Sequence, residues 1–409
     1  MPRVGRYTNA ATTIDYAPDD LPRGTTIDAL SLPTVDRSAT SGLLYRNGTK
    51  PRALVALMHP RVDFTRHYLV PPLLRAGYAV WAQRSRNVNN DLTTVHEQLL
   101  LDIAAAHSHL AELGFDSVVL VGNSGGASLY ALYYQQAALD PGSRLTAAPS
   151  RLPVDLTVAM PKPHALVFLA PHAGQGDVML HCIDPSVSDE RDAGSVIREL
   201  DLFDPQNGFR EPQQTSSYSE EFLSRYRAAQ RDRVHRIDAS MRDLLRRQAE
   251  WRRDGENGDA QARRRAQAGE FTTVYRTDAD PRTVDLSLDP SSRDYGSIFG
   301  RRPDITNYGA IGFGRLTTPH AWLSTWSGLS TNATLRLTAP SITCPILLAS
   351  YTADNSVFPS DVRAMEDALT TSDLTKIDID ADHFGYVIGT EERNPDAADA
   401  ICAWLDGHT

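Results

Sequence analysis

The feature that most constrains this 409-residue chain is a short apolar run that ends in a serine set among glycines. Residues 118–121 are Val-Val-Leu-Val, residues 122–126 are Gly-Asn-Ser-Gly-Gly, and apolar residues at helical spacing follow. This order predicts a buried strand, a sharp turn and a helix. A serine at the apex of so tight a turn holds a strained backbone, and side chains two residues before and after it would collide. Glycine at 122 and 126 therefore fits a turn that presents Ser124.

Gly122, Ser124 and Gly126 match G-x-S-x-G, the nucleophile elbow. The alternative interpretation is an ordinary serine that caps a helix after a buried strand. The N–H of Gly125 would lie unpaired at the start of the helix, where it can bind a developing oxyanion. Gly125 is therefore the first expected oxyanion donor.

Further apolar runs predict a sheet around this turn. Buried strands are expected at 53–58, 78–82, 165–170, 345–351 and 376–379, after two antiparallel strands at 25–32 and 40–45. Helical patterns separate the later strands, for example at 65–76 and 92–113. This alternation predicts an α/β fold with a mostly parallel central sheet and helices on both faces.

The alternation stops after Gly174 and resumes near residue 335. We therefore expect a core formed by 1–174 and 335–409, and a large, mainly helical cap insertion at 175–334. The insertion should hold a long helix at 219–253, begun by a capping box of Ser217 and Glu220, and a polar segment at 255–269. An aromatic-rich stretch at 305–331 should pack over the carboxyl edge of the sheet. Residues 1–23 should form a surface arm.

Three polar residues each follow a predicted strand: Ser124, then Asp354, then His383. Because the carboxyl ends of parallel strands share one edge, these residues can converge. Ser124 would be the nucleophile, His383 the general base and acid, and Asp354 the group that orients the imidazole. Asp382 and Asp361 are rival acids, and Asp354 taken alone also fits a turn.

A second oxyanion donor should come from the loop after the strand at 53–58, which reads His59-Pro60-Arg61-Val62. Proline has no N–H, so the expected donor is Arg61, with Val62 second. Five further residues are candidate pocket residues, with plain packing as the alternative for each: His59, His172, His320, Trp322 and Trp326.

These motifs resemble the α/β-hydrolase superfamily over 25–174 and 340–409, including the chain order Ser, Asp, His. The His-Pro loop, the Gly-Asn-Ser-Gly-Gly elbow and the long insertion look most like a group of bacterial α/β-hydrolases with a large cap after strand six. The resemblance implies hydrolysis of a carboxylic ester or lactone through an acyl-enzyme. C–C or amide hydrolysis, acyl transfer, and a non-catalytic ligand-binding role on the same fold stay open.

Composition limits the kinds of molecule that this protein is expected to bind. A net charge of -10 argues against nucleic-acid binding that rests on bulk charge, and a small-molecule substrate with an apolar acyl or aryl group is expected. Three cysteines form no disulfide framework, and no motif indicates a metal or another cofactor. No leader or membrane span is visible, so we expect a cytoplasmic protein. Whether the long helix pairs two copies as a homodimer stays open.

Overall fold

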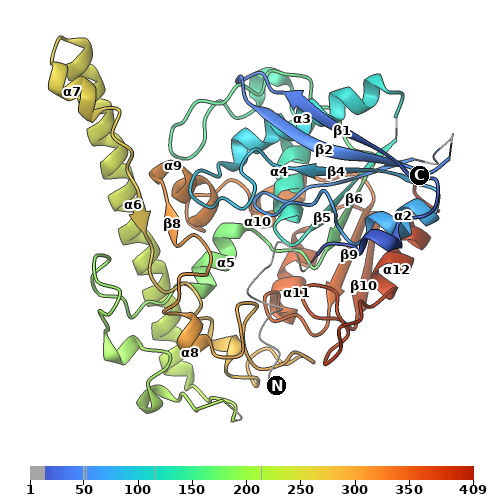
Figure 1. Ribbon diagram of the computed structural model, residues 1–409. Coiled ribbons are helices and arrows are strands. Elements are labelled where there is room, and N and C mark those ends of the chain that lie inside the picture. Colours follow the sequence, from blue (N-terminus) through green and yellow to red (C-terminus); the bar gives the residue numbers. More distant parts are fainter. Residues whose placement is uncertain (1–13, 49–50, 52, 116, 213) are drawn as a thin grey trace.

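An eight-stranded sheet forms the centre of the molecule (Figure 1). The structure, a computed structural model, describes residues 14–48, 51, 53–115, 117–212 and 214–409, so most of the predicted arm at 1–23 lies outside the described residues. The strand order is β1-β2-β4-β3-β5-β6-β9-β10. The strands are β1 (Thr26–Pro33), β2 (Ala39–Arg46), β3 (Leu54–Leu57), β4 (Ala79–Arg84), β5 (Val118–Asn123), β6 (Ala165–Leu169), β9 (Ile346–Tyr351) and β10 (Leu374–Ile379).

The sheet is antiparallel from β1 through β2 to β4 and parallel from β4 to β10. Every residue of β3, β5, β6 and β9 is buried. Such strands must be apolar on both faces, which explains why the sequence shows continuous apolar runs there instead of alternation. The predicted α/β class and mostly parallel sheet are confirmed.

Helices cover both faces of the sheet and create two cores. One core joins the sheet to α3, α4 and α11, and the other joins it to α2 and α12. These helices are α2 (Val70–Arg75), α3 (His96–Glu112), α4 (Gly126–Ala138), α11 (Pro359–Ala368) and α12 (Asp396–Leu405). The helix predicted at 65–76 begins only at Val70 because Pro71 and Pro72 are tolerated only in a first turn.

The chain between β6 and β9 adds a further set of short elements and one long helix. They are α5 (Gln175–Cys182), α6 (Glu220–Glu256), α7 (Ala260–Arg265), β7 (Thr272–Thr273), α8 (Pro303–Thr306), β8 (Leu316–Thr317), α9 (Pro319–Ala321), the π-helical turn η6 (Trp322–Trp326) and α10 (Leu335–Thr338), with 3-10 turns η3 (Arg198–Leu200), η4 (Pro205–Asn207), η5 (Pro281–Thr283) and η7 (Ala339–Ser341). Two more 3-10 turns, η1 (Pro18–Asp20) and η2 (Pro141–Ser143), lie outside this segment. The expected boundaries of the cap insertion, residues 175–334, remain a prediction.

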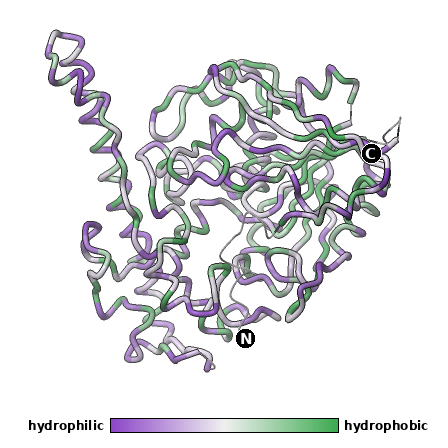
Figure 2. Tube along the Cα trace, viewed as in Figure 1, coloured by the Kyte–Doolittle hydropathy of each residue, from purple (hydrophilic) through white to green (hydrophobic). Residues whose placement is uncertain are grey.

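The start of α6 differs from the predicted capping box. Ser219, not Ser217, is the N-cap, and its hydroxyl accepts the N–H of Phe222 at 3.1 Å. The polar segment expected at 255–269 contains the helix α7, which is capped by Asp259. The outer part of α6, with α7 at its tip, projects from the molecule, and this tip is largely hydrophilic (Figures 1 and 2).

The inner part of α6 is anchored by an aromatic core. Val234, Ile237 and Met241 of α6 pack with residues of α5 and η6, including Trp322 and Trp326. The indole N–H of Trp322 donates to the carboxylate of Asp238 at 2.7 Å, so the buried polar group is satisfied.

The turn from β5 to α4 is packed too tightly for side chains at its glycines. A Cβ at Gly126 would lie 2.5 Å from the carbonyl oxygen of Met58, just beyond β3. A Cβ at Gly122 would lie 2.6 Å from the Cα of Ala127. The two glycines therefore let strand and helix meet at Ser124, as the sequence pattern predicts.

We expect Gly126→Ala to lower the free energy of unfolding by about 1–3 kcal/mol, because the new methyl must displace backbone. Gly142→Ala is the control, since no atom lies within 4 Å of the position that its new methyl would take. It should leave stability unchanged or raise it by up to about 1 kcal/mol. Urea unfolding of both variants measures this, and equal stabilities would contradict the packing argument.

Candidate active site

Ser124 lies at the carboxyl end of β5 in a left-handed backbone conformation, with a φ of 56°. Few residues other than glycine adopt this region, and such strain clusters at functional sites. Its N–H donates to the carbonyl of Leu169 at 2.9 Å, and its carbonyl accepts the N–H of His172 at 3.0 Å. The turn is thus held from both sides by the chain that follows β6.

Two further side chains meet Ser124 from distant parts of the sequence. The Oγ of Ser124 lies 3.1 Å from Nε2 of His383, and Nδ1 of His383 lies 2.7 Å from Oδ2 of Asp354. Asp354 follows β9 and His383 follows β10. The three residues that the sequence placed after separate strands therefore form one continuous hydrogen-bonded chain.

The strand order of the sheet and the order Ser, Asp, His at its carboxyl edge together define the architecture. The chain has the α/β-hydrolase fold. No protein-family model matches it, and no curated protein matches its sequence.

Many solved structures are similar to this chain over nearly its whole length. One is DcsB in complex with its substrate analogue, with a TM-score of 0.48 and 13% identity over 94% of this chain and 99% of that chain. Another is the Pyrococcus furiosus esterase PF2001, with a TM-score of 0.44 and 12% identity over 99% of this chain and 96% of that chain. A third is a Paleococcus ferrophilus monoacylglycerol lipase, with a TM-score of 0.43 and 14% identity over 94% of this chain and 100% of that chain. These similarities are in the path of the backbone and not in the sequence.

The electrostatics of this site favour a base at His383. Burial disfavours the charged imidazole, but the carboxylate of Asp354 and its hydrogen bond outweigh burial and raise the pKa of His383 above 6.5. Because Nδ1 donates to Asp354, Nε2 of the neutral ring is free to accept the hydroxyl proton of Ser124.

The rival acids have other partners. The Oδ1 of Asp382 accepts the N–H groups of Phe384 and Tyr386 at 2.9 and 3.0 Å, so it shapes the loop of His383. Asp361 accepts the N–H of Phe358 at 3.1 Å and pairs with Arg282. Asp354 itself is almost fully buried, and its Oδ1 accepts the N–H groups of Ser356 and Val357 at 2.7 and 2.9 Å.

A second imidazole borders Ser124. The ring of His172 is stacked on that of His383, with centroids 5.1 Å apart, and its Nδ1 lies 3.5 Å from Oγ of Ser124. Its Nε2 is 2.9 Å from the hydroxyl of Ser356. Burial, followed by the charges of His383 and Arg61, holds the pKa of His172 well below 6.5, so this ring is neutral at pH 7. His172 therefore lies beside the reacting atoms, as expected.

The second predicted oxyanion donor requires a correction. The N–H groups of Arg61 and Val62 both donate to Nδ1 of His59, each at 3.0 Å. Neither group is left to bind an oxyanion in this arrangement. The guanidinium of Arg61 instead pairs with Asp91 and lies over the ring of Trp326 at 5.0 Å. By contrast, no acceptor among the described residues takes the N–H of Gly125.

Three of the four remaining pocket candidates pack elsewhere, and the fourth, His59, borders the site. Trp322 and Trp326 are fully buried in the aromatic core of the insertion, so packing is their role. Nδ1 of His320 lies 2.8 Å from the hydroxyl of Ser150, and His320 borders a groove lined by arginines of α6. His59 does border the site, since its Nε2 would lie 3.0 Å from a Cβ at Gly125.

Three residues near the site were missed from the sequence: Gln175, Phe313 and Ser356. Gln175 lies against Gly125, and the ring of Phe313 packs edge-on against His172 with centroids 6.3 Å apart. Gln175 and Ser356 follow strands at the carboxyl edge, which is a usable signal. Phe313 lies in the aromatic-rich stretch 305–331, which was expected to pack over the carboxyl edge, but that expectation did not single it out as a site residue.

No described helix has the length and apolar content needed to cross a membrane. Within the described ranges, no three His, Cys, Asp or Glu side chains gather as a metal would need. A cavity of about 200 Å³ adjoins the site, with His172 and Ser356 in its wall and apolar residues opposite: Val178, Leu335, Val357 and Met365.

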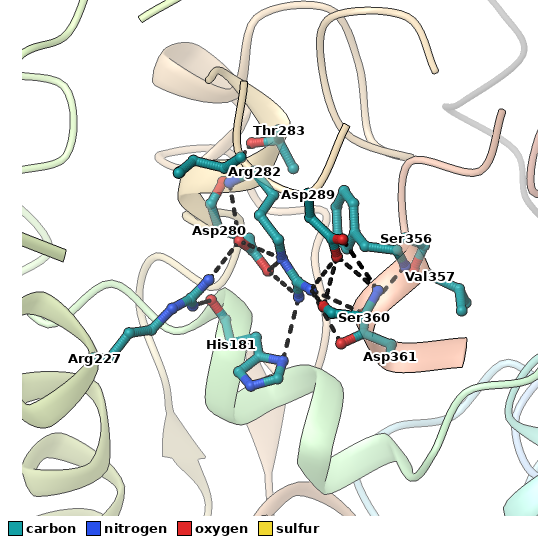
Figure 3. A network of polar contacts seen from close by, with 12 residues as sticks. His181, Arg227, Asp280, Arg282, Thr283, Asp289, Ser356, Val357, Ser360 and Asp361 are labelled. Atoms are coloured by element: carbon teal, nitrogen blue, oxygen red, sulfur yellow. Dashed lines mark hydrogen bonds and ion pairs between the residues drawn. The ribbon is translucent and has the colours of Figure 1, made fainter. Parts of the chain in front are cut away.

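The loop that carries Asp354 is tied to the insertion by a buried ion network (Figure 3). Arg282 donates to Asp280 at 2.8 Å and to Asp361 at 3.0 Å, and its guanidinium lies 3.9 Å from the ring centroid of Phe358. Arg227 of α6 reaches Asp280 at 2.8 Å. The insertion therefore braces the start of α11, immediately after the loop that binds Asp354.

We expect Arg282→Met to lower the free energy of unfolding by about 3–5 kcal/mol at pH 7, because it removes one of the two arginine partners of the buried Asp280 and the arginine partner of Asp361. Burial opposes ionisation of Asp280, but the charges of Arg227 and Arg282 outweigh it and hold its pKa below 3.8. The stabilisation is thus complete above the ordinary pKa and shrinks as the pH falls below it.

The control is Arg301→Met, because Arg301 is 79% exposed and its pair with Asp294 at 3.4 Å lies at the surface. It should change stability by no more than about 1 kcal/mol. Denaturant unfolding at several pH values measures both variants. Equal effects of the two substitutions would contradict the bracing role.

Proposed function

We propose that this protein is a cofactor-independent serine hydrolase that cleaves a carboxylic ester or lactone. The observation that carries the proposal is the chain of contacts from Ser124 through His383 to Asp354, at 3.1 and 2.7 Å. A serine hydroxyl is a weak nucleophile unless a base takes its proton, and this arrangement supplies that base in the correct tautomer.

The proposed reaction has two halves. Oγ of Ser124 attacks the acyl carbon while Nε2 of His383 takes the hydroxyl proton, and the carbonyl electron pair moves onto oxygen. When the carbonyl re-forms, the bond to the leaving oxygen breaks and that oxygen takes the proton from His383. Water then repeats the sequence on the acyl-enzyme and releases the acid. Asp354 stabilises the imidazolium that forms in each half.

An apolar acyl or aryl group suits the surroundings of this site. The ring of Phe313 packs on His172, and that of Phe384 packs on His383 with centroids 5.4 Å apart. The neighbouring cavity of about 200 Å³ exposes mainly apolar surface, although Asp177, Asp280 and Arg282 also line it, and we infer that it takes the acyl group of such a substrate. Both features support a small, apolar ester.

We expect the wild-type protein to hydrolyse members of a p-nitrophenyl ester panel from acetate to dodecanoate. Ser124→Ala should lower kcat/KM by at least about 10⁴-fold, because no nucleophile remains. The control is Ser128→Ala, one turn further along α4, where the hydroxyl donates to the carbonyl of Gly125 at 3.3 Å. It should stay within about threefold of wild type. An active Ser124→Ala protein would rule out the mechanism.

The pH dependence should report His383. Only the neutral imidazole accepts a proton, and the pKa of His383 is raised above 6.5, so kcat/KM should rise with pH and reach half its plateau above pH 6.5. Asp354→Asn leaves burial, which lowers this pKa, and removes the two largest interactions that raise it, so that only the smaller effect of Asp382 still raises it. The half-maximal pH should therefore fall, while the plateau drops on the order of 10⁴-fold. An unchanged half-maximal pH in Asp354→Asn would contradict the assignment.

A further inference from the structure

The loop after β3 leaves the oxyanion without its expected backbone donors. Because Nδ1 of His59 accepts the N–H groups of both Arg61 and Val62, the proton of the neutral ring must be on Nε2. Burial, with the charge of Arg61 second, holds the pKa of His59 well below 6.5, so the ring is neutral at pH 7. The loop therefore presents a side-chain donor, Nε2–H of His59, in place of backbone N–H groups.

Two side-chain nitrogens lie against Gly125, the residue whose N–H has no acceptor. A Cβ at Gly125 would be 2.1 Å from Nε2 of Gln175 and 3.0 Å from Nε2 of His59. A Cβ lies about 2.5 Å from its own backbone nitrogen, so these two nitrogens lie within about 4.6 and 5.5 Å of the Gly125 nitrogen. One oxygen at about 2.9 Å from each of two donors can bridge nitrogens up to about 5.8 Å apart. These upper bounds allow a single oxyanion to lie close to all three donors.

The side chain of Gln175 is otherwise unexplained. It is 1% exposed, and its Oε1 is buried without a hydrogen-bond partner. An unsatisfied buried amide costs about 1–3 kcal/mol, so each such group needs a reason. An amide whose NH2 group is held against Gly125, ready for the charge that develops on the substrate, is such a reason.

The backbone holds this amide in one place. Gln175 is the first residue of α5 and lies between two glycines without room for side chains. A Cβ at Gly174 would be 2.7 Å from the carbonyl oxygen of Ala333, and a Cβ at Gly176 would be 2.7 Å from the nitrogen of Gly328. The start of α5 is thus wedged against 327–334, as a preorganised donor requires.

We propose that the side-chain amide of Gln175 and Nε2–H of His59 complete the oxyanion hole with the N–H of Gly125. This inference rests on the proposed hydrolase function. When Oγ of Ser124 attacks the acyl carbon, the electron pair that moves onto the carbonyl oxygen is stabilised by these donors. The pair returns when the carbonyl re-forms and the leaving oxygen departs with the proton from His383.

The test compares Gln175→Met and Gln175→Glu, neither of which has a donor, with wild type. On the best p-nitrophenyl ester, kcat should fall about 10²- to 10³-fold while KM changes little. Affinity for butylboronic acid, which forms a tetrahedral adduct on Ser124 as the proton passes to His383, should fall in parallel. Unfolding in urea should show that Gln175→Met is at least as stable as wild type, because it removes an unsatisfied amide.

Gln136→Met in α4 is the matched control, because this buried amide is satisfied. Its Oε1 accepts the N–H of Leu145 at 2.8 Å, and its Nε2 donates to Gln135 at 3.1 Å. Gln136→Met should lower stability and leave kcat within about threefold of wild type. This is the opposite of the result expected for Gln175→Met. If both Gln175 variants keep wild-type kcat and boronate affinity, the inference is overturned while the hydrolase function stands. A wild-type protein that neither cleaves any ester nor binds the boronate overturns both.

Discussion

The site depends on one hydrogen bond, from Nδ1 of His383 to the carboxylate of Asp354 at 2.7 Å. Both groups are almost fully buried, so neither is stable there with an unmatched charge or an unpaired polar atom. The bond fixes the imidazole in the tautomer that leaves Nε2 toward Ser124. The remaining carboxylate oxygen is held by two backbone N–H groups, which stops the acid from turning toward other donors.

Other parts of the structure hold these side chains and their backbone in this arrangement. Ser124 stays in a left-handed conformation because Gly122 and Gly126 let the strand and the helix close around it. The insertion supplies Arg282, which braces the chain after Asp354, and Gln175, whose amide oxygen is unpaired. Backbone strain and an unsatisfied buried polar atom both reduce stability, and the two large cores on the faces of the sheet offset that cost.

Much of this was visible in the sequence because strands and strand ends are encoded locally. Continuous apolar runs marked the buried strands, and the polar residues just beyond three of them meet at one edge. The second oxyanion donor was wrong because the direction of the Arg61 and Val62 N–H groups depends on how His59 turns back on its own loop. The sequence of the loop does not show how the side chain of His59 is oriented. Gln175 was missed because its neighbour, Gly125, lies fifty residues earlier in the chain.

The most direct test of the central claim is covalent labelling by a fluorophosphonate, followed by peptide mapping. The account predicts one adduct, on Ser124, that forms on the folded wild-type protein, is lost after denaturation, and forms far more slowly in a His383→Ala variant. A folded wild-type protein that stays unlabelled, or an adduct on a serine other than Ser124, would contradict it.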